Sequence, residues 1–139
     1  MAEVTARNEP GRALTVVIDT GAHQLLADEP VAVGGDDLGP GPYQLLLASL
    51  ASCMVMTLEL YARRKGWPLE SVQVRVRHGR RDALPEDDLP AGRRIDRITY
   101  AVDLAGPLAE EQRSRLLEIA ARCPVHRTLT GKIEIVRED

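Results

Sequence analysis

The 139-residue sequence contains no phenylalanine, and aromatic residues make up only 3% of it. Proteins that bind single-stranded nucleic acid commonly stack bases on aromatic rings, so the sequence disfavours that function. The formal net charge is −3, and therefore no general positive field attracts nucleic acid or anionic lipid. We predict neither a nucleic-acid nor a membrane partner. Apolar residues still make up 44% of the chain, which is enough for one core in a single domain spanning residues 1–139.

Cysteine is also scarce, and Cys53 and Cys123 are the only two. Two cysteines are too few for a disulfide-stapled secreted scaffold or a four-ligand zinc site, and His126 beside Cys123 makes only half of a metal site. The charged N-terminal segment is not followed by the apolar stretch of a secretory signal. We therefore expect a cytoplasmic protein without metal or cofactor, whose cysteines are either buried apolar residues or reactive thiols.

The pattern of apolar residues predicts a mixed α+β fold. Period-two alternation predicts strands at 14–19, 23–27, 72–77 and 98–104, with a short closing strand around Ile133 and Ile135. Helices are expected over 43–65, with Pro42 at the first position, and from 107 to about 122. The Gly- and Pro-rich stretch 28–42 predicts a loop with a fixed path, and the polar stretch 79–94 a long, mobile hairpin loop. Strands that arrive as hairpins favour antiparallel pairing over βαβ units.

The first predicted helix is unusually apolar. From Leu45 to Leu58 it carries no charge and is apolar on most faces, which predicts a helix surrounded by protein. A membrane span is the alternative interpretation. The uncharged run is shorter than the ~20 residues that a span requires, and Glu59 and Arg63 follow it closely, so a core helix is favoured.

The position of Cys53 does not by itself predict a reactive thiol. It lies about three turns inside the predicted helix, where the helix dipole gives little help to a thiolate. No Lys or Arg occurs between residues 13 and 62, so an activating cation must come from a distant segment or from another subunit. Taken alone, a cysteine in such a helix is most simply a small buried apolar residue.

Cys123 has a different sequence context. It follows the end of the second predicted helix, whose negative dipole opposes a thiolate, although the adjacent Arg122, His126 and Arg127 act in the opposite direction. This context suits a resolving thiol better than an attacking one. A separation of 70 residues from Cys53 does not by itself establish that the two thiols meet.

Two other sequence features carry less chemical information. The glycines of the 28–42 loop lack the phosphate-binding loop pattern and its lysine, so they predict a shaped loop. The adjacent acidic pairs Asp28-Glu29 and Asp36-Asp37 could act as catalytic carboxylates, but in such a loop they are typical of solvated turns and helix termini.

Four segments taken together carry a family resemblance. They are ADEP at 27–30, GGDDLGPGPYQLLLASLASC at 34–53, MTLELYARRKGWPLE at 56–70 and RCPVHRTL at 122–129. They closely resemble the OsmC/Ohr family of osmotically inducible and organic hydroperoxide resistance proteins, in an OsmC-like branch with a CPVH signature. The resemblance covers roughly residues 21–129 and includes both cysteines.

The resemblance implies both a fold and an activity. The fold would be OsmC-like, with antiparallel-rich sheets wrapped around a long buried central helix in an intertwined homodimer whose active sites lie at the subunit interface. The activity would be that of a thiol-dependent peroxidase in the oxidative stress response. Cys53 would attack the peroxide and become a sulfenic acid, Cys123 would condense with it to a disulfide, and an external dithiol would reduce that disulfide. An apolar site would favour organic over hydrogen peroxide.

The sequence departs from the family's peroxidases at the activating residues. Those proteins place a Glu ten residues before the attacking Cys, where this chain has Tyr43. The Arg that this Glu positions normally comes from the N-terminal strand region, and residues 13–62 contain none here. The candidate cations are Arg122, Arg127, His126 and His23, with Arg12 as an outsider. A second function therefore stays open, a redox sensor or a binding protein for a small apolar ligand with low peroxidase turnover.

Overall fold

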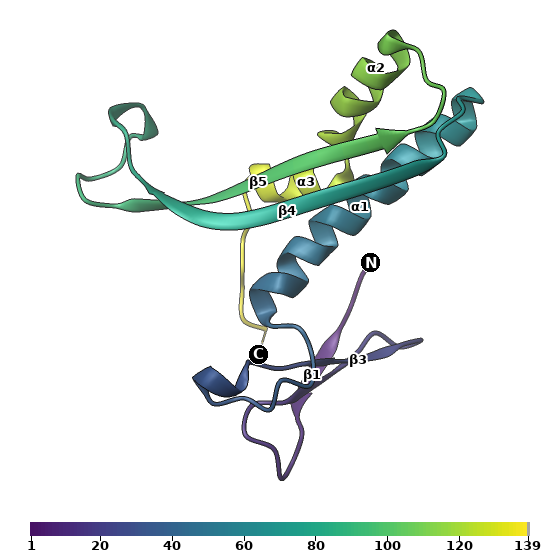
Figure 1. The fold of residues 1–139 in the computed structure, drawn as a ribbon. Coiled ribbons are helices and arrows are strands. Elements are labelled where there is room, and N and C mark those ends of the chain that lie inside the picture. Colours follow the sequence, from purple (N-terminus) through teal and green to yellow (C-terminus); the bar gives the residue numbers. More distant parts are fainter. Residues whose placement is uncertain (139) are drawn as a thin grey trace. The chain divides into compact units, whose positions relative to one another are not determined.

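The computed structural model describes residues 1–138, which form two compact units (Figure 1). The N-terminal unit is Met1–Leu46 and the C-terminal unit runs from Leu47 onward. Each unit contains an antiparallel sheet, and three α-helices complete the fold. This arrangement confirms the α+β prediction.

A three-stranded antiparallel sheet forms the N-terminal unit. Its strands are β1 (Thr5–Asn8), β2 (Val16–Asp19) and β3 (Gln24–Ala27), in the order β1-β2-β3. The predicted hairpin corresponds to β2 and β3, whereas β1 was not predicted. At the turn Gly21 has φ 90°, and its N–H donates a 2.7 Å hydrogen bond to Asp19 Oδ1.

The loop after β3 is organised by a buried carboxylate. Asp28 is only 3% exposed and accepts hydrogen bonds from Thr15 Oγ1 (2.8 Å) and from the N–H groups of Glu29 (2.8 Å), Asp36 (3.4 Å) and Leu38 (3.2 Å). Burial alone would raise the pKa of Asp28, but these donors together hold it below its ordinary value. The loop has the fixed path that the sequence predicted, while Asp28 itself is not the solvated turn residue that we expected.

Two glycines allow this loop to pass close to other backbone. A Cβ at Gly35 would collide with the carbonyl oxygen of Glu29, and one at Gly39 with that of Leu26. The short 3-10 helix η1 (Val31–Val33) lies between Glu29 and Gly35, the two residues of the first close approach. The loop leads directly into α1 (Pro42–Lys65), which ends at Gly66 with φ 69°, as the sequence predicted.

The C-terminal unit is built on a long antiparallel hairpin. Strands β4 (Ser71–Asp82) and β5 (Arg94–Ala105) pair along their whole length, with Val74 opposite Val102 (Figure 1). Residues 79–82 and 94–97 belong to the paired strands, so the prediction of a loop over 79–94 was wrong at both ends.

Cross-strand ion pairs explain why these polar segments form strands. Asp96 Oδ1 lies 2.8 Å from His78 Nε2 and 3.1 Å from Arg80 Nε, and Asp82 pairs with Arg94 at 3.6 Å. Opposite charges placed across an antiparallel pair stabilise it, although they look like loop residues in the sequence. The connection is correspondingly shorter and contains the 3-10 helix η2 (Pro85–Asp87).

Two further helices follow the hairpin. The first, α2 (Glu110–Ala120), was predicted, but α3 (Pro124–Thr130) was not. The predicted closing strand around Ile133 and Ile135 was wrong, because residues 132–138 form no strand. Both side chains are exposed, at 51% and 95%, and no strand among residues 1–138 pairs with them.

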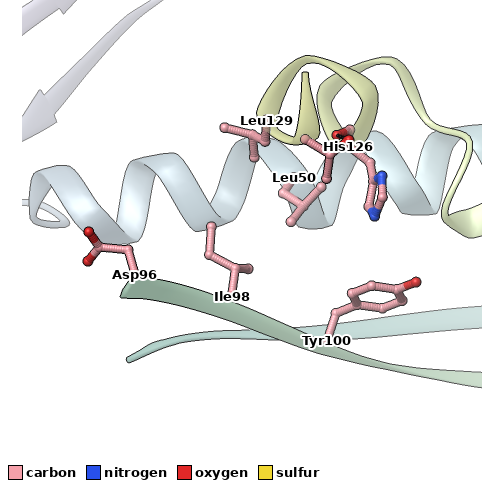
Figure 2. Close-up of a pocket in the computed structure, with 7 residues that line it drawn as sticks. Leu50, Asp96, Ile98, Tyr100, His126 and Leu129 are labelled. Carbon is pink, nitrogen blue, oxygen red and sulfur yellow. Dashed lines mark hydrogen bonds between the residues drawn. The ribbon is translucent and has the colours of Figure 1, made fainter. Parts of the chain in front are cut away.

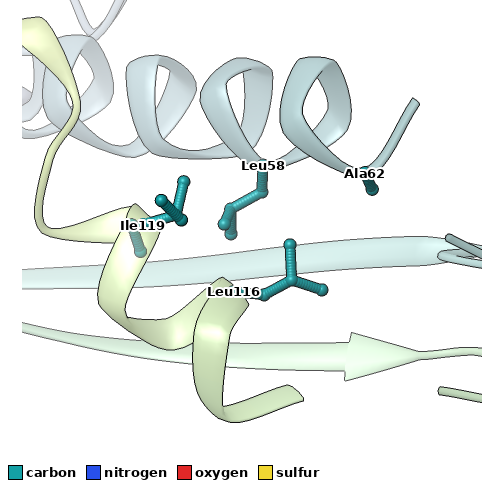
Figure 3. Close-up of a cluster of buried hydrophobic side chains, with 5 residues drawn as sticks. Leu58, Ala62, Leu116 and Ile119 are labelled. Carbon is teal, nitrogen blue, oxygen red and sulfur yellow. The ribbon is translucent and has the colours of Figure 1, made fainter. Parts of the chain in front are cut away.

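Helix α1 buries one stripe of side chains spaced four residues apart, which are Leu50, Met54, Leu58 and Ala62. In its C-terminal half the stripe meets α2 in a cluster of Leu58, Ala62, Leu116, Ile119 and Ala120, which we call the α2 cluster (Figure 3).

Helix α1 is long and apolar enough to cross a membrane, with a mean hydropathy of 1.8 over its best 18 residues. The packed stripe favours a core helix instead.

Candidate active site

The structure brings the two cysteines together in the C-terminal unit. Cys123 is fully buried with Leu50 and Met54 of α1, and the half-buried Cys53 packs against this group. We call this set the thiol cluster, with Val74, Val76, Ile98, Val125 and Leu129 as its partly buried members. Both cysteines are free thiols. Contact between residues 70 apart was the point that spacing alone could not establish.

Cys123 occupies the N-cap of α3. Its Sγ accepts a 3.3 Å hydrogen bond from the N–H of His126. Burial raises the pKa of the Cys123 thiol, the neighbouring Cys53 thiol raises it further, and the N–H groups of His126 and Val125 partly oppose the rise. A neutral thiol is therefore favoured at Cys123. Burial is the main cause, rather than the dipole of the preceding helix that the sequence suggested.

The two candidate arginines lie on the surface. Arg122 and Arg127 are both exposed. The backbone N–H of Arg127 donates a 3.1 Å hydrogen bond to the carbonyl of Cys123. The charge of Arg122 acts on Tyr61, whose pKa it helps to lower, after a hydrogen bond from Arg115 as the first cause. Neither guanidinium is hydrogen-bonded to a cysteine within the described part of the chain.

A cavity of about 220 Å³ adjoins the thiol cluster (Figure 2). Its apolar lining is Leu50 of α1, Ile98 of β5 and Leu129 of α3, and all three also belong to the thiol cluster. Its polar lining consists of Asp96, Tyr100, His126 and Thr130. The cavity and the thiol cluster therefore have three residues in common, although neither cysteine itself lines the cavity. This cavity is the candidate site for a small ligand.

The carboxylate of Asp96 lies at one end of the cavity. The pKa of Asp96 lies below its ordinary value because His78 and then Arg80 hydrogen-bond to it. Sequence analysis missed Asp96, Tyr100 and Leu129. The only available signal was the period-two spacing of residues 96, 98 and 100, which places their side chains on one face of β5.

His126 forms the other end of the cavity, together with Tyr100. Its N–H donates to Cys123 Sγ, and its carbonyl accepts a 2.8 Å hydrogen bond from Thr130 Oγ1. The imidazole meets the Tyr100 ring edge to face, with centroids 6.2 Å apart and an interplanar angle of 89°. Figure 2 shows the ring directed toward Tyr100 on β5. Of the predicted cations, His126 is the one that lines the cavity.

The remaining predicted residues lie in the N-terminal unit. Tyr43 is the second residue of α1 and is 55% exposed. His23 is an exposed turn residue whose N–H donates to Thr20 Oγ1 at 3.2 Å, and Arg12 is exposed before β2. Among residues 1–138, no three His, Cys, Asp or Glu side chains are grouped to hold a metal ion.

Comparison with known proteins identifies the family. The family model described as OsmC-like protein matches residues 34–137, which is most of the chain and includes both cysteines. The chain belongs to this family. No curated protein shows significant sequence similarity to it.

Solved structures of the family share the fold. An OsmC-like protein from Mycoplasma pneumoniae is 24% identical, with a TM-score of 0.72, and the alignment covers 94% of this chain and 88% of that one. OhrB of Bacillus subtilis, an organic hydroperoxide resistance protein, is 27% identical, with a TM-score of 0.60 and coverages of 94% and 91%. The organic hydroperoxide resistance protein OsmC from Legionella pneumophila is 20% identical, with a TM-score of 0.65 and coverages of 94% and 90%.

Proposed function

We propose that this OsmC-like protein is a thiol-dependent peroxidase that reduces organic hydroperoxides. The observation that carries the proposal is the contact between Cys53 and Cys123 near a small cavity whose lining is partly apolar. Family membership and the likeness to an organic hydroperoxide resistance protein support the same chemistry. The apolar lining favours an organic substituent on the peroxide, because burying it adds to binding.

The different surroundings of the two thiols support different roles. Cys53 is half-buried, so its thiolate is the one that attacks the distal peroxide oxygen. The S–O bond forms, the O–O bond breaks, the other oxygen leaves with the electron pair, and Cys53 becomes a sulfenic acid. Cys123 is fully buried and its pKa is raised, so it stays a neutral thiol until Cys53 has been oxidised. It then condenses with the sulfenic acid, releases water and forms the Cys53–Cys123 disulfide. An external dithiol reduces this disulfide and returns both thiols.

Peroxide consumption tests the proposal directly. Purified protein with excess cumene hydroperoxide and dithiothreitol should consume peroxide over many turnovers, and Cys53 should become resistant to alkylation before the reductant is added. Protein that consumes no peroxide, with Cys53 still fully alkylatable, would refute the activity. Hydrogen peroxide is the control substrate without an organic substituent. A lower rate with it than with cumene hydroperoxide would support the role of the apolar lining.

We further propose a cytoplasmic homodimer. Helix α1 leaves Met56 63% and Leu60 56% exposed on the side away from its buried stripe, and Leu117 of α2 is 47% exposed. Apolar side chains on the faces of long helices commonly pack against another subunit. Sedimentation should give twice the chain mass of 15.3 kDa. Met56→Glu should weaken the dimer, and a monomeric wild-type protein would refute this part of the proposal.

The second candidate function is a redox sensor or an apolar-ligand binding protein with low turnover. It is favoured by the exposed positions of Arg122 and Arg127 and by Tyr43 at the position of the family peroxidases' glutamate. Intact mass after one equivalent of peroxide, followed by a turnover assay, separates the two functions. A sensor would form the disulfide but turn over slowly with reductant, whereas a peroxidase would do both quickly.

A further inference from the structure

The fold directs the His126 imidazole into the cavity, and no group within residues 1–138 hydrogen-bonds to it. Its backbone is fixed on both sides, by Cys123 Sγ and by Thr130 Oγ1, at the start of α3. The ring is half-buried and lines the cavity with Tyr100. Within residues 1–138 neither ring nitrogen is hydrogen-bonded to another group. A polar atom that faces a cavity in this way is free to interact with a ligand.

The proposed reaction requires a proton at the side of the substrate away from Cys53. When a thiolate displaces the distal oxygen of an alkyl hydroperoxide, the O–O electron pair leaves on the other oxygen as an alkoxide. An alkoxide is a strong base and a poor leaving group, so a positioned acid accelerates the cleavage, typically by about 10²–10⁴-fold. The buried Cys123 thiol is a poor acid because its pKa is raised.

We propose that His126 is the catalytic acid that protonates the alkoxide leaving group, and this inference rests on the peroxidase function proposed above. In this step the Cys53 thiolate forms the S–O bond, the O–O bond breaks, and the imidazolium of His126 transfers its proton to the departing oxygen. The products are Cys53 sulfenic acid, an alcohol and neutral imidazole. The sulfur is oxidised and the peroxide is reduced, with no further reactant. Solvent reprotonates the imidazole before the next turnover.

The groups around His126 fit this role. From α1, Cys53 lies one helical turn after the cavity residue Leu50. From β5, the Tyr100 ring faces the imidazole, and Asp96 lies at the opposite end of the cavity, hydrogen-bonded to His78 and Arg80. At the N-cap of α3, Cys123 Sγ accepts a hydrogen bond from the backbone N–H of His126, and the Arg127 side chain is exposed. Histidine changes charge close to neutral pH, so it can both donate and recover a proton there.

Two peroxides that share a phenyl group but differ in leaving group test the assignment. Cumene hydroperoxide releases an alkoxide, whereas peroxybenzoic acid releases a carboxylate, which needs no proton. In single-turnover measurements on the full-length protein, His126→Gln should slow Cys53 oxidation by cumene hydroperoxide about 100-fold and change the rate with peroxybenzoic acid by no more than about twofold. A residue that only supports the fold would slow both reactions equally.

His78→Gln is the matched control, because it removes the other half-buried imidazole of this unit, at the Asp96 end of the cavity. The ratio of the two rates should stay at its wild-type value in this variant. An equal slowing of both peroxides in His126→Gln, or the same change of ratio in His78→Gln, would overturn the role of His126 while leaving the peroxidase function intact. A wild-type protein that reacts with neither peroxide would overturn both proposals.

A measurement on the wild-type protein keeps the inference testable if His126→Gln does not fold. Proton transfer during O–O cleavage should give a solvent deuterium isotope effect with cumene hydroperoxide and none with peroxybenzoic acid. Equal isotope effects with the two peroxides would overturn the assignment.

Discussion

The buried stripe of α1 supports two clusters of different character. Leu58 and Ala62 pack against α2 in the α2 cluster, which contains only aliphatic buried side chains (Figure 3). Met54 and Leu50, one and two turns before Leu58, pack around Cys123 in the thiol cluster, which borders a cavity of about 220 Å³ (Figure 2). Side chains with the same four-residue spacing thus form a closed apolar core in the C-terminal half of α1 and part of a site with space for a ligand in its N-terminal half.

The difference arises from the elements that meet the helix. In the α2 cluster, α2 contributes three buried aliphatic side chains, which are Leu116, Ile119 and Ala120. At the thiol cluster, the short α3 and its N-cap contribute a thiol and an imidazole, and β5 contributes Asp96 and Tyr100 to the cavity. Substitutions in the α2 cluster should therefore change stability, and substitutions in the thiol cluster should change chemistry first.

The largest effect is expected for Cys53→Ser. Peroxide consumption should fall below detection, because a serine hydroxyl is not ionised at neutral pH and cannot act as the attacking thiolate. The unfolding temperature should stay close to that of the wild type, since Cys53 is half-buried and the replacement is nearly isosteric. Peroxide assays and thermal unfolding on the same samples check both points. Single-turnover consumption at the wild-type rate would show that Cys53 is not the attacking thiol.

The next largest effect is expected for Cys123→Ser. Without a resolving thiol the reaction should stop after one turnover and leave a Cys53 sulfenic acid that dimedone traps, a gain in mass that intact mass spectrometry detects. The initial rate of the first turnover should change little. Continued turnover with dithiothreitol at the wild-type rate would contradict a resolving role for Cys123.

The sequence was sufficient to predict the main elements of both clusters except α3. The run without Pro or Gly between Pro42 and Gly66 predicted α1, and alternation at 72–77 and 98–104 predicted the N-terminal half of β4 and the C-terminal half of β5. These signals are local and strong, because a long apolar run or a regular alternation admits few alternative structures. The paired acidic and basic residues of the hairpin ends gave no such signal, since only their cross-strand partners make them strand residues.

The candidate site was predictable only in part. Sequence motifs singled out Cys53, Cys123 and His126, and these three do lie together in the C-terminal unit. The seven residues of α3 are too few to show helical periodicity, so the N-cap role of Cys123 could not be predicted. The cavity needs side chains from α1, α3 and β5 at once, and no local pattern specifies which elements meet.

Leu116→Ala tests whether substitutions in the α2 cluster change stability and leave the chemistry of the thiol cluster unchanged. Leu116 is fully buried in the α2 cluster, and its truncation should lower the free energy of unfolding by about 2–5 kcal/mol. The adjacent Leu117 is 47% exposed, so Leu117→Ala is the matched control, with a smaller loss. Below its unfolding transition, Leu116→Ala should keep the wild-type rate of Cys53 oxidation. Equal losses of stability in the two variants would contradict the burial that distinguishes these neighbours.

The smallest expected effect is the dependence of stability on pH that Cys123 contributes. Folding raises the pKa of Cys123, so the folded thiol holds its proton more tightly than the unfolded one. Below the ordinary thiol pKa of about 8.5 both states are protonated, and the full stability is present. Above it the unfolded thiol ionises first, and stability falls until the folded thiol also ionises.

Denaturant unfolding at pH 7 and pH 9.5 measures this effect as a difference between proteins. Wild-type protein should lose more stability between the two values than Cys123→Ser, because all other titrating groups are common to both. Leu116→Ala should keep the wild-type pH dependence, since it removes no titrating group. An equal loss in wild type and Cys123→Ser would mean that burial does not hold this thiol in its neutral form.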